Sequence, residues 1–322
     1  MKVLVTGGAG YIGSTLTASL LRRGVYTRVV DNLRFGGASL LKLYSYSGFD
    51  FLKGDIRRKS ILRDAIERDM DAVIHLAAIV GDPACSRQPD LAMEVNHKAT
   101  LNLVNLCRQR AIRRFIFIST CSNYGLRDTS RLAAENNPLN PLSIYAKTKV
   151  EAERYILTLA DSDFHPCILR LATVYGISPR MRFDLLVNEF TRDAIVRKRL
   201  VVYGEQFWRP YVHVDDVANA ITMILTSPIE KISGEIFNVG GNRENYRKRQ
   251  IVDLILKHVP DARVEVVAQG ADPRDYRVSF EKIRRTLSFN LKWCVEDGIT
   301  QIKSAFEQGL FNHPFAKKYL NS

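Results

Sequence analysis

Tyr145 and Lys149 are four residues apart in a stretch that predicts a helix, so their side chains share one face of it. An ammonium beside a phenol favours the phenolate and lowers the phenol pKa from about 10 toward neutral pH. Thr120 ends an earlier apolar run, and its hydroxyl could hydrogen-bond a substrate oxygen whose proton Tyr145 removes or returns. The three residues predict hydride transfer between a carbinol and a nicotinamide.

A glycine-rich run, Thr-Gly-Gly-Ala-Gly-Tyr-Ile-Gly, comes directly after the first apolar stretch and ends at Gly13. It fits the spacing G-x-G-x-x-G and also the more open G-x-x-G-x-x-G, which Gly7, Gly10 and Gly13 supply. Early glycines permit a tight turn and let backbone N–H groups approach phosphates, and the last lets the next helix pack close to the sheet. The run therefore predicts a dinucleotide-binding loop.

Asp31 ends the second apolar run, 18 residues after Gly13. A carboxylate about 20 residues beyond such a loop binds the adenosine ribose and repels a 2′-phosphate. The sequence therefore favours NAD over NADP, although Arg34 lies close enough to Asp31 to leave NADP as an alternative.

The elements that position these residues are indicated by the alternation of apolar runs and amphipathic stretches over residues 1 to about 170. Strands are predicted near 2–6, 27–31, 50–53, 71–76, 114–119 and 166–171. Helices are predicted near 11–23, 58–68, 89–110 and 143–160. This alternation indicates an α/β fold with a doubly wound parallel sheet of the Rossmann type, which binds ligands beyond the carboxyl ends of its strands.

The pattern becomes less regular after about residue 175. Helices are predicted near 182–196, 214–226, 248–258 and 296–308, and strands near 200–203 and 235–239. We expect residues 1–175 to form the NAD-binding domain, with later segments near 199–226 returning to it. Residues 176–322 are expected to form a smaller, mixed α/β lobe that binds the substrate.

Composition excludes several classes of protein. A chain of 322 residues with 46% hydrophobic residues can bury a sizeable core, and no run reaches the 18 or more apolar residues of a membrane span. The five cysteines are scattered without a C-x-x-C pair, which favours reduced thiols in the cytoplasm and neither zinc nor disulfides. We therefore expect a cytoplasmic protein without a metal.

The net charge of +13 has three interpretations: nucleic-acid binding, binding of a diphosphate-bearing small molecule, or a solvated basic surface. The basic clusters are spread along the chain without interleaved aromatic residues, which argues against binding of single-stranded nucleic acid.

Taken together, these motifs resemble those of the extended short-chain dehydrogenases/reductases, in the nucleotide-sugar epimerase and dehydratase family. The resemblance covers nearly the whole chain, at Thr6 to Gly13, Asp31 to Leu33, Gly54 to Ile56, His75 to Ala78, Thr120 to Gly125, Tyr145 to Lys149, Leu169 to Gly176 and Arg209 to Asp216. It implies an NAD-dependent enzyme acting on a nucleoside-diphosphate sugar, with Tyr145 as general acid and base.

The resemblance also implies roles for individual residues. Thr120, Tyr145 and Lys149 would be catalytic. The cofactor would be bound by Gly7, Gly10, Tyr11, Ile12, Gly13, Asp31, Asn32, Asp55, Ile56, Leu76, Ala77, Ala78, Tyr145 and Lys149. The substrate would be bound by Asp82, Ser122, Thr173, Arg209 and Arg274. Arg209 matches an arginine that binds the nucleotide diphosphate, a role suited to a forked donor, and Arg274 is a looser match for a second clamp.

Departures from the family pattern narrow the choice of reaction. Cys121 and Ser122 stand where dehydratases carry acidic residues, so elimination of water would lack its usual acid or base. Thr173 replaces an asparagine common in the family. Asp82 either contacts sugar hydroxyls or hydrogen-bonds its own backbone in a proline-containing turn.

We therefore expect an epimerase that oxidises a sugar hydroxyl transiently and returns the hydride to the opposite face, with one retained NAD serving repeated cycles. A net oxidoreductase on the same substrate class is the nearest alternative, and a non-catalytic RNA-binding protein is a third. His75, His213 and Cys121 are interpreted as structural. A homodimer is expected because the helices near 89–110 and 143–160 resemble those that pair in relatives.

Overall fold

A seven-stranded, wholly parallel sheet forms the centre of the computed structural model, which describes residues 1–267 and 274–321. Its strand order is β11-β7-β5-β4-β1-β2-β3. The strands are β1 (Lys2–Thr6), β2 (Tyr26–Asp31), β3 (Phe49–Lys53), β4 (Ala72–His75), β5 (Arg114–Thr120), β7 (His165–Leu171) and β11 (Glu235–Val239). The order reverses between β1 and β4, which opens a crevice at their carboxyl ends. The predicted doubly wound fold is confirmed.

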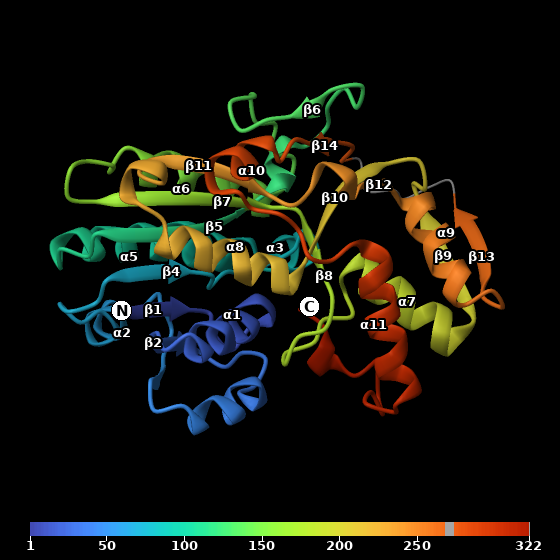
Figure 1. The fold of residues 1–322 in the computed structure, drawn as a ribbon, viewed down its shortest axis with the longest axis horizontal. Helices are drawn as coiled ribbons and strands as arrows, with labels where there is room; N and C mark the ends of the chain where they lie inside the picture. Colours follow the sequence, from blue (N-terminus) through green and yellow to red (C-terminus); the bar gives the residue numbers. More distant parts are fainter. Residues whose placement is uncertain (268–273, 322) are drawn as a thin grey trace.

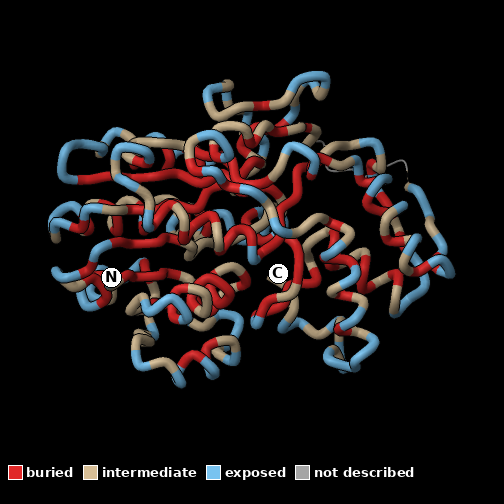
Figure 2. Tube along the Cα trace, viewed as in Figure 1, coloured by how far each residue is buried: buried red, intermediate tan, exposed pale blue. Residues whose placement is uncertain are grey.

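Helices cover both faces of this sheet (Figure 1), and the side chains of each strand alternate between them. Val3 and Val5 pack toward one face, and Leu4 between them packs toward the other. The first face is covered by α1 (Tyr11–Arg22), α8 (Val214–Thr226) and α10 (Glu281–Leu287). The second is covered by α2 (Lys59–Ala65), α5 (Thr100–Gln109) and α6 (Ile144–Leu157). Apart from the edge strand β3, whose residues are half-buried or exposed, the strands are buried along much of their length, as Figure 2 shows.

The helix predicted near 89–110 is divided into α4 (Pro89–Met93), a π-helical turn (Glu94–Ala99) and α5. Asn96 lies in the π-helical turn, and its side chain binds both backbone groups of Ile79, accepting from N–H at 2.7 Å and donating to C=O at 2.9 Å. The irregular turn therefore fixes the loop after β4, where α3 (Asp82–Arg87) begins.

A second lobe lies beyond one end of the sheet (Figure 1). It contains a three-stranded sheet of β8 (Thr173–Tyr175), β10 (Trp208–His213) and β12 (Asn245–Arg247), and the pair β9 (Arg199–Tyr203) and β13 (Arg263–Val267). Its helices are α7 (Leu186–Arg197), α9 (Lys248–His258) and α11 (Val295–Glu307). A further small pair, β6 (Leu132–Ala133) and β14 (Arg277–Val278), joins the segments before α6 and α10.

The two halves of the chain are interleaved. From the second half, α8 packs on α1 and β11 pairs with β7, whereas β9 belongs to the lobe. The helix predicted near 182–196 begins only at Leu186, because the backbone of Leu185 is extended (φ −103°, ψ 131°). Every helix in the described part of the chain is too short or too polar to span a bilayer.

Candidate active site

A cleft of about 520 Å³ lies at the carboxyl edge of the sheet, facing the lobe. It is lined by every residue predicted for the site except Arg209: Gly7, Gly10, Tyr11, Ile12, Gly13, Asp31, Asn32, Asp55, Ile56, Leu76, Ala77, Ala78, Asp82, Thr120, Ser122, Tyr145, Lys149, Thr173 and Arg274. Residues separated by more than 250 positions in sequence are thus brought to one surface.

The turn from β1 into α1 leaves no room for a Cβ at Gly7 or Gly13. Gly7 has φ +76°, and a Cβ there would lie 2.7 Å from the backbone nitrogen of Ala77. A Cβ on Gly13 would lie 2.2 Å from the carbonyl oxygen of Gly7. Because Gly10 precedes α1 without a side-chain cap, the first N–H groups of this helix are left for a ligand. This cradle fits a diphosphate.

The carboxylate of Asp31 is held in one orientation at the end of β2. It accepts hydrogen bonds from the N–H groups of Ala9, at 3.1 Å, and Leu33, at 2.8 Å. Burial raises the pKa of Asp31, and the two N–H groups oppose that shift. An acceptor held in this way fits a ribose hydroxyl. With the glycine cradle, it makes the described residues compatible with NAD.

Tyr145 and Lys149 lie at the start of α6, which is capped by Ser143. Lys149 is 2% exposed; its Nζ donates to the carbonyl of Ile118 at 2.8 Å and lies 4.6 Å from the centre of the Phe117 ring. Burial lowers the pKa of Lys149 to about 8, and the charge of Glu153 opposes this shift. Burial raises the pKa of the Tyr145 phenol. This shift is opposite to the lowering predicted from the neighbouring ammonium, and the charges that oppose it are those of Arg182 and Arg274.

Thr120 stands at the last position of β5. Its Oγ1 accepts the N–H of Ser122 at 3.1 Å, an interaction that caps the short 3-10 helix η3 (Cys121–Tyr124). The hydroxyl proton is therefore directed away from that N–H and remains available to a substrate oxygen in the cleft.

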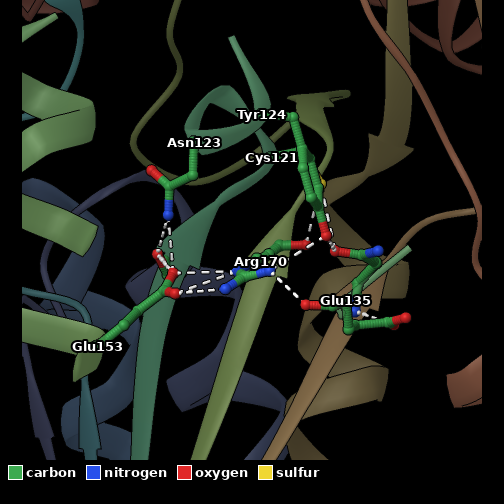
Figure 3. Close-up of polar contacts among 8 residues, drawn as sticks. Cys121, Asn123, Tyr124, Glu135, Glu153 and Arg170 are labelled. Atoms are coloured by element: carbon green, nitrogen blue, oxygen red, sulfur yellow. Dashed lines mark hydrogen bonds and ion pairs between the residues drawn. The ribbon is translucent and has the colours of Figure 1, made fainter. Parts of the chain in front are cut away.

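A buried polar network anchors α6 to the sheet beneath these residues (Figure 3). Glu153 accepts from Arg170 Nη2 at 2.7 Å and from Asn123 Nδ2 at 2.7 Å. Arg170 also donates to the Tyr124 hydroxyl at 3.2 Å. The network joins α6 to β7 and η3, and so fixes the register of the catalytic face of α6 against β5.

Cys121 is part of the same buried layer. Its thiol donates to the carbonyl of Arg170 at 3.3 Å, and burial raises the pKa of Cys121 well above its usual value. A thiol held protonated in this way is a poor nucleophile, as the structural interpretation of Cys121 requires.

Asp82 and Arg274 meet across the substrate end of the cleft. Arg274 Nη1 lies 2.8 Å from Asp82 Oδ2 and donates to Ser122 Oγ at 3.1 Å. Asp82 thus faces the cleft and Arg274, in place of the turn contact to its own backbone that the sequence left open. The carboxylate and guanidinium of these residues, both near Tyr145, can bind hydroxyl and anionic groups of a substrate.

Arg209 differs from its predicted place. It is 5% exposed, lies outside the lining of the cleft, and donates to the carbonyls of Trp208, at 2.7 Å, and Arg274. Its guanidinium therefore supports the backbone that carries Arg274. The motif predicted a cation near the diphosphate; in the described structure the guanidinium carbon of Arg209 lies 5.2 Å from the centre of the Tyr276 ring, and the residue does not line the cleft.

His75 and His213 are both buried in the described structure. His75 lies between the hydroxyls of Thr6, at 2.6 Å, and Thr100, at 2.9 Å, and burial lowers its pKa to about 3. His213 caps α8 by accepting the N–H of Asp215 and stacks on Trp293. These contacts agree with structural roles, and the described residues contain no group of three His, Cys, Asp or Glu side chains that could hold a metal.

Sequence reasoning did not assign several further residues that line the cleft, among them Phe35, Arg180, Arg182 and Asn321. They come from loops and from the last described residues, where no hydrophobic period points to them. The Arg-Met-Arg spacing of residues 180–182 is the one signal that could have found two of them.

Comparison with known proteins adds the family. The model of the NAD dependent epimerase/dehydratase family matches residues 3–240. The uncharacterized UDP-glucose epimerase YtcB of Bacillus subtilis is 29% identical over 93% of this chain and 96% of its own. A dTDP-glucose 4,6-dehydratase of Actinoplanes sp. is 29% identical over 94% and 96%. The structure of Thermus thermophilus UDP-glucose 4-epimerase in complex with NAD superposes with a TM-score of 0.82, at 29% identity, over 95% of this chain and 100% of that one.

Proposed function

The chain belongs to the NAD dependent epimerase/dehydratase family, and we propose that it inverts one carbinol carbon in the sugar of a nucleoside-diphosphate sugar. The observation that carries the proposal is the presence of Thr120, Tyr145 and Lys149 on one wall of a cleft whose other end is the glycine cradle. The likeness to epimerases and dehydratases of UDP- and dTDP-sugars supports the substrate class.

The residues divide the chemistry between them. Tyr145 takes the proton from the sugar hydroxyl and returns it, Lys149 stabilises the phenolate in the interval, and Thr120 orients the same oxygen. When bound, NAD supplies the hydride acceptor and donor. Asp31 and the glycine cradle hold that cofactor, together with the remaining predicted residues.

Epimerisation is preferred over elimination of water because of the two residues directly after Thr120. Cys121 is buried and protonated, and Ser122 is bonded to Arg274, so neither supplies the acid or base that elimination needs. The carboxylate of Asp82 forms an ion pair with Arg274 and serves as the counterion of that guanidinium.

We assign the sugar to Asp82, Ser122 and Arg274 and the diphosphate of the substrate to Thr173, with Arg209 acting through the backbone of Arg274. The NAD-binding domain would comprise residues 1–175 except β8, with α8, β11 and α10, and the rest of 176–322 would form the substrate lobe with β8. We also propose a cytoplasmic homodimer that pairs α5 and α6. Light scattering at micromolar protein should give twice the chain mass of 36.6 kDa, and a single chain mass would contradict the dimer.

The proposed reaction is tested by incubating the protein with a panel of UDP- and dTDP-sugars, with and without added NAD, before mass spectrometry and NMR. A product of equal mass with one inverted stereocentre supports it. Loss of water from the product, or gain or loss of two hydrogens with stoichiometric consumption of cofactor, overturns it. Tyr145→Phe, which lacks the proposed acid and base, is the inactive comparison and should lose activity about 10²- to 10⁴-fold.

A further inference from the structure

Arg180 is an unusual lining residue because it is a buried cation with an unsatisfied donor, Nε. It is 6% exposed, and its Nη2 donates to the carbonyl of Leu320 at 2.9 Å. Its guanidinium carbon lies 4.3 Å from the centre of the Phe35 ring. Nε is buried and has no hydrogen-bond partner among the residues that the structure describes. Burial and the charge of Arg182 lower the pKa of Arg180 to about 10, as expected for a cation that its surroundings leave undercompensated.

The loop that carries Arg180 is docked on the phosphate-facing end of α1. The Tyr11 hydroxyl donates to the carbonyl of Gly176 at 2.6 Å, and Ser178 Oγ donates to the carbonyl of Tyr11 at 2.6 Å. Thr15 donates to Ser178 at 3.2 Å. Arg180 therefore lies only two residues after Ser178, which contacts the first turn of α1.

The other side of Arg180 faces the adenosine end of the cleft. Phe35, on which the guanidinium stacks, comes four residues after the end of β2, and the charge of Asp31 acts on Arg180. The guanidinium thus lies between the N-terminus of α1 and the carboxylate that fits the ribose. A dinucleotide that spans these two points places its diphosphate beside Arg180.

We propose that Arg180 binds the diphosphate of NAD from the lobe side of the cleft, facing the glycine cradle, and so retains the cofactor. A forked guanidinium with a free N–H suits this anion, and the helix N-terminus supplies donors from the opposite side. The inference rests on the proposed function only for its cofactor.

The last described residues, drawn in red in Figure 1, hold Arg180 in this position. Phe183 N–H donates to the carbonyl of Tyr319 at 2.9 Å, and Asn321 N–H donates to Asp184 at 3.2 Å. The carbonyl of Leu320 then restrains one arm of the guanidinium. Retention of this kind suits a reaction in which the same cofactor molecule serves successive turnovers.

The test measures binding without turnover. Arg180→Gln and Arg180→Lys are stripped of bound nucleotide and titrated calorimetrically with NAD, ADP, adenosine and UDP, and the NAD that co-purifies with each protein is quantified. Arg180→Gln should weaken the binding of NAD and ADP about 10- to 100-fold and leave the affinity for adenosine unchanged. The affinities of Arg180→Lys should lie between those of Arg180→Gln and the parent protein. Arg285→Gln, at a side chain 75% exposed on α10, is the control and should change none of these values.

Equal weakening of adenosine would overturn the inference, because Arg180 would then shape the adenosine pocket through Phe35. Weaker binding of UDP with unchanged binding of NAD would also overturn the inference, because Arg180 would then belong to the nucleotide-sugar site. If Arg180→Gln fails to fold, as judged by circular dichroism, the ADP-to-adenosine comparison is decided on Arg180→Lys. A protein that binds NAD through Arg180 but epimerises no sugar upholds this inference and overturns the proposed function.

Discussion

Glu153 and Arg170 form an ion pair inside the protein, with 2.7 Å between Oε2 and Nη2 and side chains only 2% and 4% exposed. Glu153 lies one turn beyond Lys149 on α6, and Arg170 lies on β7 next to β5, the strand that ends at Thr120. The pair therefore acts on the active site in two ways: it fixes the catalytic helix to the sheet, and it places a negative charge near the buried ammonium.

Arg170→Met should lower the free energy of unfolding by about 3–5 kcal/mol, because it leaves the Glu153 carboxylate buried without its counterion. The double variant Glu153→Leu/Arg170→Met should recover part of this loss, since neither charge then remains buried. Urea denaturation monitored by circular dichroism measures both. Arg284→Met, which removes an exposed pair with Glu281, is the control and should leave the free energy nearly unchanged. Equal effects of Arg170→Met and Arg284→Met would contradict the prediction.

Glu153→Gln should shift the alkaline limb of kcat to lower pH. Lys149 has a pKa of about 8, which the charge of Glu153 raises; removing that charge lowers the pKa further, and the ammonium that Tyr145 needs is lost earlier as pH rises. The measurement is kcat from pH 6 to 10 for both proteins. A lower kcat with an unmoved alkaline limb would mean that Glu153 acts only through packing.

Acid should destabilise the protein through His75. Its pKa is about 3 when folded and about 6.5 when unfolded, so the unfolded chain binds the extra proton between these values and stability falls as pH decreases from 6.5 toward 3. Between pH 6.5 and 5 this group alone should account for about 2 kcal/mol. Comparison of urea unfolding for the parent protein and His75→Asn isolates the effect, and identical pH slopes would refute it.

Gly7→Ala and Gly24→Ala separate backbone strain from crowding. Both glycines have a positive φ, +76° and +75°, but a Cβ on Gly7 meets the backbone of Ala77 at 2.7 Å whereas one on Gly24 meets nothing within 4 Å. Gly24→Ala should cost about 1 kcal/mol of stability and leave bound NAD unchanged. Gly7→Ala should lose more stability and most of its NAD, measured by thermal unfolding and by assay of released nucleotide. Similar NAD content in the two variants would contradict the prediction, because the cradle would then accommodate a Cβ at Gly7.

The sheet and the NAD end of the site were predictable because their signals are local. β1, the glycine run and Asp31 succeed one another with fixed spacing, and strands buried on both faces are rich in β-branched residues. The lobe was harder to predict. β8, β10 and β13 pair with strands distant in sequence, so the sequence indicated neither their partners nor their periodicity. Arg209 shows the same limit in a side chain, because its motif position was clear but the packing of Tyr276 and Arg274 decides where its guanidinium points.

The interleaving of β11 and α8 with the first half of the chain has a consequence for biosynthesis. Until residue 239 has left the ribosome, the outer edge of β7 lacks its neighbour, and the apolar face that α8 covers stays exposed. A fragment cut near residue 175 would carry the nucleotide motifs but present an open strand edge to other chains, a hazard for aggregation. The nascent protein must therefore emerge through most of its length before its first domain can close.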